Sequence, residues 1–338
     1  MKRCLRRWLR SGVAVGICAG LGACGGPEAS PNGDALRLPL WESSADSQTT
    51  GVVAIHARMA GAWFFACTGS LVAPNVVLTA GHCATAWSAQ AAADAACDGD
   101  QEPIAASADS LLVTLGAVAP RDVAPPHEGV HAVARIALAS SSGVSAAGWC
   151  GRDIAVLILR DSVAPQIATP LALRLDARPV AGERFDAVGF GPNGQLEPST
   201  GLRTRAQASV TCVGADCNIT NQVMPTEWLS NDLAACSGDS GGPALDSSGR
   251  IFGVLSRGFS DCSSIVYGAV SHWSAFLCRE LEREAADTPP ACAEFSPAVA
   301  ANCAFNLAAS GNTNRSVHAL GGALIATLLL LRRRRRPA

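Results

Sequence analysis

Hydrophobic residues in the middle of the chain form short runs of five to seven positions, and Gly, Pro, Asn or Asp residues separate many of these runs. Runs of this length that are rich in Val, Ile and Leu are typical of β-strands. The expected strands are residues 51–56, 62–66, 75–79, 111–117, 153–159, 184–190, 251–256 and 264–270. No long helical repeat alternates with them, so the pattern predicts an all-β barrel or sandwich.

One helical pattern follows the last of these runs, at residues 271–285. Its apolar residues recur at intervals of three and four positions and would share one face of a helix: Trp273, Phe276, Leu277 and Leu281. The segments on either side contain Pro, Gly, Ser and Asn without such a period, and we expect a tether at 24–39 and a linker at 286–316. The sequence therefore predicts one folded domain over residues 40–285.

The first residues of the chain have the layout of a secretory signal. Residues 1–10 contain five basic side chains, and residues 11–21 form an apolar stretch too short to cross a bilayer. We therefore expect residues 1–23 to be a signal peptide and the protein to be exported. The LGAC tetrapeptide that ends at Cys24 resembles a bacterial lipobox, which implies a lipid on Cys24. The alternative is an ordinary signal peptide with an incidental cysteine.

The last residues, 317–338, contain a second apolar stretch. Thirteen mostly apolar residues at 319–331 precede five arginines at 332–336. As a helix they would span about 20 Å, less than the ~30 Å hydrocarbon core of a bilayer. This end is either a short stop-transfer helix or a sorting tail that resembles those of Gram-negative surface proteins. We expect attachment to the membrane through Cys24, this tail or both, at the outer membrane or cell surface, or secretion.

Composition and charge narrow the class of partner. The chain has 338 residues, of which 49% are apolar and 16% are charged, so it can bury a core and is not disordered. Ten of its 26 basic residues lie in the two terminal clusters, which leaves 16 basic against 28 acidic residues in the rest of the chain. An acidic body repels phosphate backbones, so no nucleic acid is expected as a partner.

Export also decides how the 14 cysteines are interpreted, because thiols outside the cytoplasm are oxidised. Cys4 and Cys18 would leave with the signal and Cys24 would carry the lipid. Eleven cysteines remain, and we expect them to form disulfides, with at least one left free or paired to another chain. Zinc is the competing interpretation for Cys212 and Cys217, but no matching His or Cys pair lies near them, so no metal is expected.

Three segments carry the groups of nucleophilic catalysis: TAGHC at 79–83, GRDIAVL at 151–157 and CSGDSGGP at 236–243. A serine hydroxyl is a poor nucleophile until a base accepts its proton, and that base needs a carboxylate to hold its tautomer. His82, Asp153 and Ser240 would supply these three groups.

The turn around Ser240 also satisfies the G-x-S-x-G pattern of α/β-hydrolases, in which the chain order is Ser, acid, His. Here the order is His82, Asp153, Ser240, and the later histidines lie on the expected helix, at His272, and in the tail, at His318. No βαβ pattern flanks the turn. The order therefore excludes an α/β-hydrolase.

Taken together, these motifs resemble those of the trypsin family of serine proteases, over residues 40–285. Further matching segments are CTGSL at 67–71, VGFG at 188–191, GVLSRG at 253–258 and VY at 266–267. The resemblance implies an all-β fold of two six-stranded antiparallel barrels with a C-terminal helix and the active site between the barrels. It implies that Ser240 attacks the peptide carbonyl, that His82 acts as base and then acid, and that Asp153 orients His82, with no cofactor.

The resemblance also implies the groups around the catalytic residues. The backbone N–H groups of Gly238 and Ser240 would form the oxyanion hole. The family's disulfides would be Cys67–Cys83 and Cys236–Cys262, and we expect two further pairs, Cys97–Cys150 and Cys212–Cys217.

The substrate would be a protein or peptide. In the family, the residue six positions before the nucleophile forms the floor of the pocket for the side chain that precedes the cut, and here it is the uncharged Ala234. The pocket walls would be Gly258 and Ile265, where Ile265 replaces the glycine of broad-pocket members. We therefore expect cleavage after small or medium apolar residues. Ser256 and Arg257 belong to the strand that would bind the substrate, and Arg257 replaces the usual aromatic residue.

Both the activity and the activation of the protein have an alternative. A catalytically inactive binding protein on the same fold is the competing hypothesis, because a fold does not determine activity.

Relatives are also cut before their folded domain, and the new amine pairs with the residue equivalent to Asp239. The equivalent start here, residues 40–43, lacks the family's glycine pair. Either a protease cuts between Arg37 and Leu40, or an internal cation pairs with Asp239.

Overall fold

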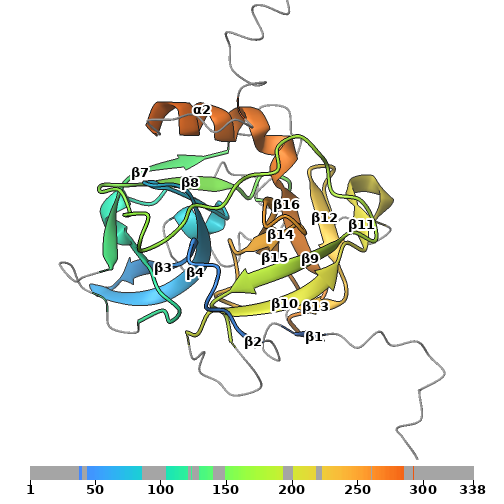
Figure 1. Cartoon of the computed structure of the whole chain (residues 1–338), viewed down its shortest axis with the longest axis horizontal. Coiled ribbons are helices and arrows are strands. Elements are labelled where there is room, and N and C mark those ends of the chain that lie inside the picture. Colours follow the sequence, from blue (N-terminus) through green and yellow to red (C-terminus); the bar gives the residue numbers. More distant parts are fainter. Residues whose placement is uncertain are drawn as a thin grey trace, which may run out of the picture. The chain divides into compact units, whose positions relative to one another are not determined.

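The described part of the chain forms two β-sheet halves and one C-terminal helix in a computed structural model (Figure 1). Described residues are 38–39, 44–85, 104–120, 123, 129–139, 149–192, 201–217, 223–259, 261–284 and 292. The expected signal peptide, the lipid site at Cys24 and the C-terminal tail lie outside these residues. Within them, no helix has both the length and the apolar character needed to cross a membrane.

The first half is a closed barrel in which every neighbouring pair of strands is antiparallel, in the order β3-β4-β5-β8-β7-β6. Its strands are β3 (Val52–Met59), β4 (Ala62–Ala73), β5 (Val76–Thr79), β6 (Leu111–Thr114), β7 (Val130–Leu138) and β8 (Ala155–Leu159). The two strands that carry the site, β5 and β8, are buried along their whole length, because their continuous Val, Leu and Ile runs face neighbours on both sides.

The second half is an eight-stranded antiparallel sheet in the order β11-β12-β16-β15-β14-β9-β10-β2. Its strands are β2 (Ser44–Ala45), β9 (Arg184–Gly189), β10 (Thr204–Ser209), β11 (Cys212–Val213), β12 (Glu227–Ser230), β14 (Pro243–Leu245), β15 (Ile251–Arg257) and β16 (Ile265–Ala269). Six strands from β12 to β10 correspond to the expected second barrel, with two-residue strands at either end. This half is a half-barrel sheet, whereas the first half closes on itself.

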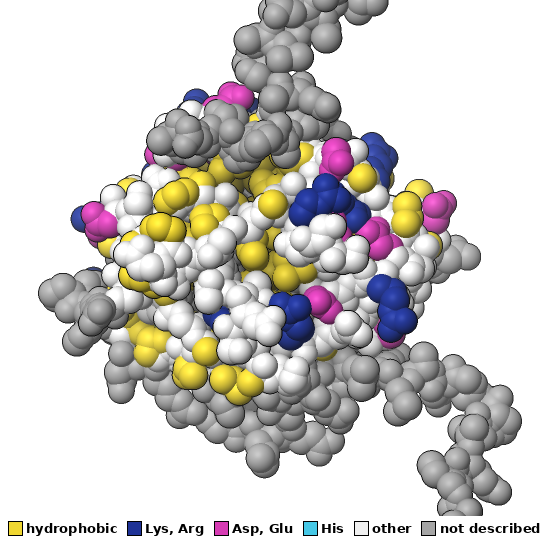
Figure 2. Space-filling view, in the orientation of Figure 1, with side chains coloured by type: hydrophobic (Ala, Val, Ile, Leu, Met, Phe, Trp, Pro, Cys, Tyr) yellow, Lys and Arg dark blue, Asp and Glu magenta, His cyan; other side chains and the backbone are white. Residues whose placement is uncertain are grey.

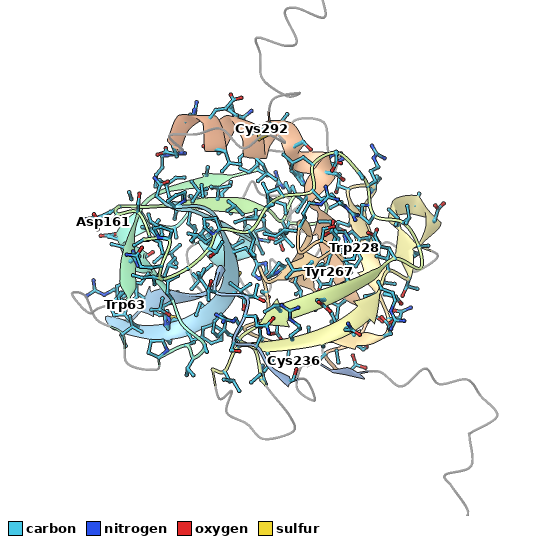
Figure 3. The ribbon with its side chains drawn as sticks, viewed as in Figure 1. Trp63, Asp161, Trp228, Cys236, Tyr267 and Cys292 are labelled. Carbon is cyan, nitrogen blue, oxygen red and sulfur yellow. A yellow bond between two sulfur atoms is a disulfide. The ribbon has the colours of Figure 1, made fainter. Side chains whose placement is uncertain are left out.

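An aromatic cluster fills the core of the second half. The rings of Trp228 and Tyr267 stack with their centroids 4.4 Å apart, and Phe252 stacks on the Trp228 ring at 5.2 Å. Phe185 meets all three rings edge to face, which is a favoured arrangement of aromatic pairs. Trp228 and Tyr267 lie close together in Figure 3. The cluster fixes the positions of β12, β15 and β16, the strands that surround the candidate substrate site.

Two short elements tie the ends of the domain to its sheets. The expected helix begins as a 3₁₀ turn, η5 (Val270–Trp273), and continues as α2 (Ser274–Glu284). A disulfide joins Cys278 of α2 to Cys292, a residue that the sequence placed in the linker. At the other end, β1 (Leu38–Pro39) pairs in parallel with β13 (Leu233–Ala234). The other 3₁₀ turns are η2 (His82–Ala84), η3 (Ala108–Ser110) and η4 (Gly214–Asp216).

Candidate active site

The pairing of β5 with β8 brings His82 and Asp153 together. Thr79, the last residue of β5, lies opposite Ala155, the first residue of β8. His82 follows β5 after two residues and Asp153 precedes β8 by two residues. Because the strands are antiparallel, the end of one and the start of the other meet at the same edge of the barrel. Two residues that are 71 positions apart in sequence therefore become neighbours.

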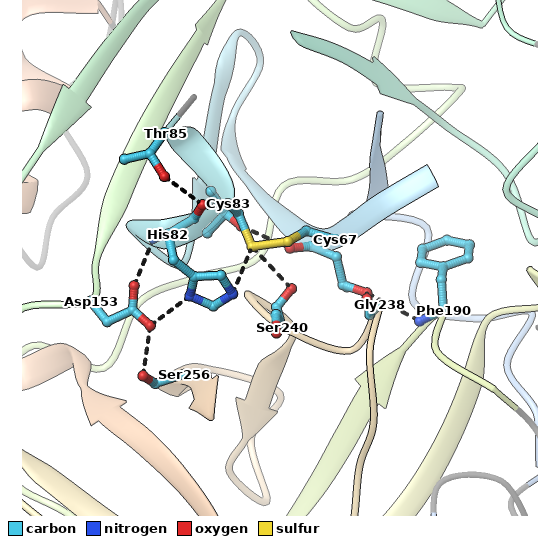
Figure 4. Close-up of a disulfide and its surroundings, with 11 residues drawn as sticks. Cys67, His82, Cys83, Thr85, Asp153, Phe190, Gly238, Ser240 and Ser256 are labelled. Atoms are coloured by element: carbon cyan, nitrogen blue, oxygen red, sulfur yellow. Dashed lines mark hydrogen bonds and ion pairs between the residues drawn. A yellow bond between two sulfur atoms is a disulfide. The ribbon is translucent and has the colours of Figure 1, made fainter. Parts of the chain in front are cut away.

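Asp153 contacts His82 at two points (Figure 4). Its Oδ2 lies 2.8 Å from His82 Nδ1, and its Oδ1 accepts the backbone N–H of His82 at 2.8 Å. Ser256 Oγ, on β15, donates to the same Oδ2 at 2.6 Å. The Asp153 side chain is only 2% exposed. A carboxylate held in this way fixes the imidazole with its proton on Nδ1, and leaves Nε2 free to accept a proton.

The charges of the two residues shift their pKa values in opposite directions. Burial lowers the pKa of His82, but the charge and hydrogen bond of Asp153 outweigh it, so the pKa lies above its usual value. Burial raises the pKa of Asp153, and the His82 charge and the hydrogen bonds from His82 and Ser256 outweigh it, so this pKa lies below its usual value. The pair thus favours an ionised carboxylate next to a base.

The turn that carries Ser240 requires glycine and is held by β4. Gly238 has φ +103°, in the left-handed region that favours glycine, and a Cβ there would lie 2.6 Å from the Phe65 ring. Thr68 contacts both sides of the turn. Its Oγ1 donates to the Gly238 carbonyl at 2.7 Å, and its backbone N–H donates to the Ser240 carbonyl at 2.8 Å. Within the described residues, the N–H groups of Gly238 and Ser240 have no acceptor.

Cys83 lies close to both His82 and Ser240. The Sγ atom of Cys83 lies 3.6 Å from His82 Nε2 and 3.7 Å from the Ser240 carbonyl oxygen. In Figure 4, Ser240 lies on the Nε2 side of the ring, away from Asp153. Cys67, Cys83 and His82 also lie as close together as the ligands of a metal ion. However, metals bind thiolates, and both sulfur atoms are joined in the Cys67–Cys83 disulfide.

Asp239, next to Ser240, is a buried carboxylate with backbone partners. Its oxygens accept the N–H groups of Gly191 at 2.8 Å and of Cys236 at 3.0 Å. Asp239 is only 1% exposed. Burial raises the pKa of its carboxyl group to about 7, although the two hydrogen bonds act to lower that pKa. Among the described residues, no Arg, His or Lys forms an ion pair with it.

The residues expected to form the substrate pocket come together around β13, β15 and β16. Ala234 ends β13, Ile265 begins β16 and is fully buried, and Gly258 follows β15. A Cβ added to Gly258 would lie 2.6 Å from Cδ1 of Ile265, so the two expected walls already touch. Figure 2 shows apolar side chains gathered in a hollow near the centre of this face, with arginine and acidic side chains nearby.

Arg257 has a different surrounding from the other expected pocket residues. Its guanidinium forms a two-pronged ion pair with Glu227 of β12. Glu227 did not stand out in the sequence, and Thr68 stood out only as part of the CTGSL segment at 67–71. Glu227 begins the short strand β12, and no motif distinguishes it from an ordinary strand residue. The contacts of Thr68 with the serine turn and of Glu227 with Gly151 cross between the two halves, and the contact of Glu227 with Arg257 joins two strands of the second half. None of these contacts has a local signal in the sequence.

The cysteines pair largely as the sequence suggested. The structure joins Cys67 to Cys83 and Cys236 to Cys262, the two pairs that the resemblance implies, and also Cys212 to Cys217. Cys150 is disulfide-bonded, while its expected partner Cys97 lies outside the described residues. The Cys278–Cys292 pair was not expected. These bonds fit an oxidising compartment.

Two β-sheet halves, with a buried Asp–His pair on one and a glycine-rich serine turn on the other, define a protein with the serine protease fold. The sequence model of the Trypsin family matches residues 43–277, and the chain belongs to the trypsin family. The comparison with curated proteins gives no match.

Proposed function

We propose that this protein is an exported serine endopeptidase that hydrolyses peptide bonds through an acyl-enzyme on Ser240. The observation that carries the proposal is the double contact of Asp153 with His82, next to a serine whose turn has two N–H groups without an acceptor in the part of the chain that the structure describes. An inert binding protein has no need for a buried carboxylate that holds one histidine tautomer. The retained pair therefore favours catalysis over the competing hypothesis of an inactive protease-fold protein.

The proposed reaction has two stages, acylation and deacylation, that use the same side chains. Ser240 Oγ attacks the peptide carbonyl carbon while His82 Nε2 takes its proton. The C–N bond then breaks, and the protonated His82 gives that proton to the leaving amine. Water then attacks the ester carbon while His82 takes its proton, the C–O bond to Ser240 breaks, and His82 gives the proton to Ser240 Oγ. Asp153 stays ionised throughout and stabilises the His82 imidazolium that forms in each stage.

The negative charge on the carbonyl oxygen would be stabilised by the N–H groups of Gly238 and Ser240. Both N–H groups belong to the turn that Thr68 holds from β4, so they would be in place before the substrate arrives. Preorganised donors of this kind are each worth about 10²–10³ in rate. No cofactor takes part in the proposed reaction.

We further propose that cleavage follows small or medium apolar residues. Ala234 contributes no charge to the pocket floor, and the contact between Gly258 and Ile265 leaves little room for a ring or a long side chain. Ser256, Gly258 and the backbone of Arg257 would bind the substrate main chain. Proteins and peptides are the substrates that this arrangement fits.

Activation is proposed to occur by a cut between Arg37 and Leu38. The pairing of β1 with β13 aligns Leu38 with Leu233, six residues before Asp239, so an amine created on Leu38 would lie beside the strand that leads to that carboxylate. A buried carboxylate without a cation costs several kcal/mol, and an ammonium group would remove that cost. An internal cation from outside the described residues is the other way to satisfy Asp239.

The proposed location is the bacterial cell envelope or the exterior. The disulfides are compatible with export, and the attachment through Cys24, through the tail at 317–338, or through both stays a proposal from sequence. A cut at Arg37 would release the domain from a lipid on Cys24, and would leave the tail as the remaining attachment.

The proposed activity is tested by incubating the mature protein with a peptide library and mapping the cut sites by mass spectrometry. We expect cuts after Ala and Val that disappear in the Ser240→Ala variant. Intact peptides with the wild-type protein, shown to be folded, would favour the inactive binding protein. Cuts dominated by Arg or Lys would overturn the specificity while leaving the catalytic proposal in place.

A further inference from the structure

Arg257 and Glu227 form an ion pair next to the catalytic carboxylate. Nη1 and Nη2 of Arg257 each donate at 2.7 Å to one oxygen of Glu227. The Glu227 side chain is 1% exposed and that of Arg257 is 17% exposed, so the pair is largely shielded from water. Two parallel hydrogen bonds between a guanidinium and a carboxylate give a fixed geometry as well as attraction. Arg257 is therefore held toward β12 by a rigid partner.

Glu227 also holds the segment that leads to Asp153. Its Oε1 accepts the backbone N–H of Gly151 at 2.6 Å, and the neighbouring Thr226 Oγ1 donates to the Gly151 carbonyl at 2.6 Å. Both backbone groups of Gly151 are thus bound by residues of the second half, two positions before Asp153. Since Asp153 belongs to the first half, these contacts join the two halves at the catalytic carboxylate.

Arg257 completes a continuous series of polar contacts to the same carboxylate. Its Nη1 donates to Ser256 Oγ at 3.2 Å, and Ser256 Oγ donates to Asp153 Oδ2 at 2.6 Å. The register of β15 against β16 shifts between Leu255 and Arg257. At this bulge Ser256 contacts Asp153 of the first half while Arg257 contacts Glu227 of β12, as β-bulges commonly re-aim side chains next to active sites.

The charged groups that act on the His82 imidazole come from both halves. Asp153 raises the pKa of His82, and Arg257 lowers it by charge repulsion. The Glu227 carboxylate cancels part of the Arg257 charge, because it lies against the guanidinium on both of its prongs. The ion pair as a whole therefore determines how strongly the second half lowers the pKa of His82, against the increase that Asp153 causes.

We propose that Arg257 and Glu227 are positioning residues of this site: together they fix the Asp153 segment to the second half and limit the basicity of His82. The catalytic part of this inference rests on the proposed peptidase function, whereas the effect on His82 does not. Arg257 stands where the resemblance placed a substrate-binding side chain, and its contacts give it a role directed at the catalytic groups instead.

The test uses the Ser240→Ala chain, in which His82 can be titrated by NMR without proteolysis. Arg257→Met removes the cation and should raise the pKa of His82 by about one pH unit. Glu227→Gln leaves the cation without its counter-charge and should lower that pKa by a similar amount. The double variant should return close to the unsubstituted value, and Arg257→Lys, which keeps the charge, should shift it least.

A purely structural role predicts a different result. Both single variants would then lower the melting temperature while shifting the His82 pKa in the same direction or leaving it unchanged, and either outcome would overturn the proposal. Arg174→Met and Glu183→Gln serve as matched controls, because these residues form a similar ion pair beside another part of the sheet. Should Arg257→Met fail to fold, Arg257→Gln removes the charge but keeps a donor toward Glu227 and is expected to give the same upward shift.

Kinetics with Ser240 present separate this inference from the proposed function. The acid limb of the kcat/KM profile should move with the His82 pKa in each variant, and kcat should fall more than KM rises. Opposite NMR shifts in a chain that hydrolyses no peptide would refute the peptidase proposal and leave the electrostatic role of the pair intact. Peptidase activity with an unchanged pH profile in the variants would support the peptidase proposal and refute the electrostatic role of the pair.

Discussion

Asp153 contacts His82 through both of its carboxylate oxygens, one at the backbone N–H and one at the ring Nδ1, each at 2.8 Å. The two contacts differ in what they control. The backbone contact holds the short η2 turn against β8, whereas the ring contact fixes the tautomer. One carboxylate therefore couples the position of the histidine to its protonation, and a change at Asp153 should affect chemistry more than folding.

Replacing Asp153 with Asn tests this coupling. An amide can keep one contact as an acceptor, but its NH₂ group cannot accept from Nδ1–H, so the imidazole would carry its proton on Nε2. We expect kcat to fall by about 10⁴-fold with little change in KM or in the circular dichroism spectrum. A loss of less than tenfold in steady-state assays would show that the carboxylate does not hold the tautomer.

Replacing Ile265 with Ala tests the specificity pocket. Ile265 Cδ1 fills the space next to Gly258, so its removal should admit larger side chains. We expect kcat/KM for cleavage after Leu or Phe to rise at least tenfold relative to cleavage after Ala, measured with matched peptide substrates.

The matched control for this change is Ile55→Ala, a fully buried isoleucine of the first barrel. Both variants should lose about 2–5 kcal/mol of unfolding free energy, but Ile55→Ala should keep the wild-type preference. An unchanged preference in Ile265→Ala would mean that other residues set the size of the pocket.

Replacing Arg37 with Gln tests the activation proposal. N-terminal sequencing of the mature wild-type protein should begin at Leu38, next to the strand pair of β1 and β13. The Arg37→Gln chain should remain uncut and show at least a tenfold lower rate of peptide hydrolysis. Full activity on a chain that still begins at Cys24 would contradict the cleavage model and point to a single-chain enzyme.

Asp239 gives the uncut chain a distinct dependence of stability on pH. Its pKa in the folded state is raised to about 7, above the ordinary value in the unfolded chain, so the folded form binds the proton more tightly. Stability from this group is fully present below about pH 4 and is lost as pH rises through 7, by roughly 4 kcal/mol in total.

The comparison is between the uncut Ser240→Ala chain and the same chain with Asp239→Asn, unfolded by urea from pH 4 to 8. The difference in unfolding free energy between them should change by that amount over the interval, in favour of the Asn chain at high pH. In the chain cut at Arg37 the dependence should disappear or reverse. A difference that stays constant with pH would mean that a cation already neutralises Asp239 in the uncut chain.

The fold was predictable where strands consist of continuous apolar residues. All eight expected strands are present, because runs such as Val76–Thr79 and Ala155–Leu159 can only be buried on both faces. Strand β10 escaped prediction because its residues Thr204–Ser209 are small or polar, and only its partners β9 and β2 define it as a strand. Strand β7 is only partly buried and carries His131 and Arg135 among its apolar residues, which weakened its pattern.

The candidate site was predictable to the extent that it lies in contiguous motifs. His82, Asp153 and Ser240 each stand in a short distinctive segment, whereas Glu227 is an isolated acid in a strand. Its role depends on contacts to Gly151 and Arg257, residues 76 and 30 positions away in the sequence. The first contact follows from the packing of the two halves and the second from the arrangement of strands within one sheet, and no local pattern encodes either of them.

The central claim, that Ser240 is an activated nucleophile, is tested most directly by covalent labelling. The mature wild-type protein is incubated with a fluorophosphonate probe, digested, and analysed by mass spectrometry to locate the modified residue. We predict stoichiometric modification of Ser240 that is lost in Ser240→Ala and strongly reduced in Asp153→Asn. A folded, correctly processed wild-type protein that takes up no probe at Ser240 would contradict it.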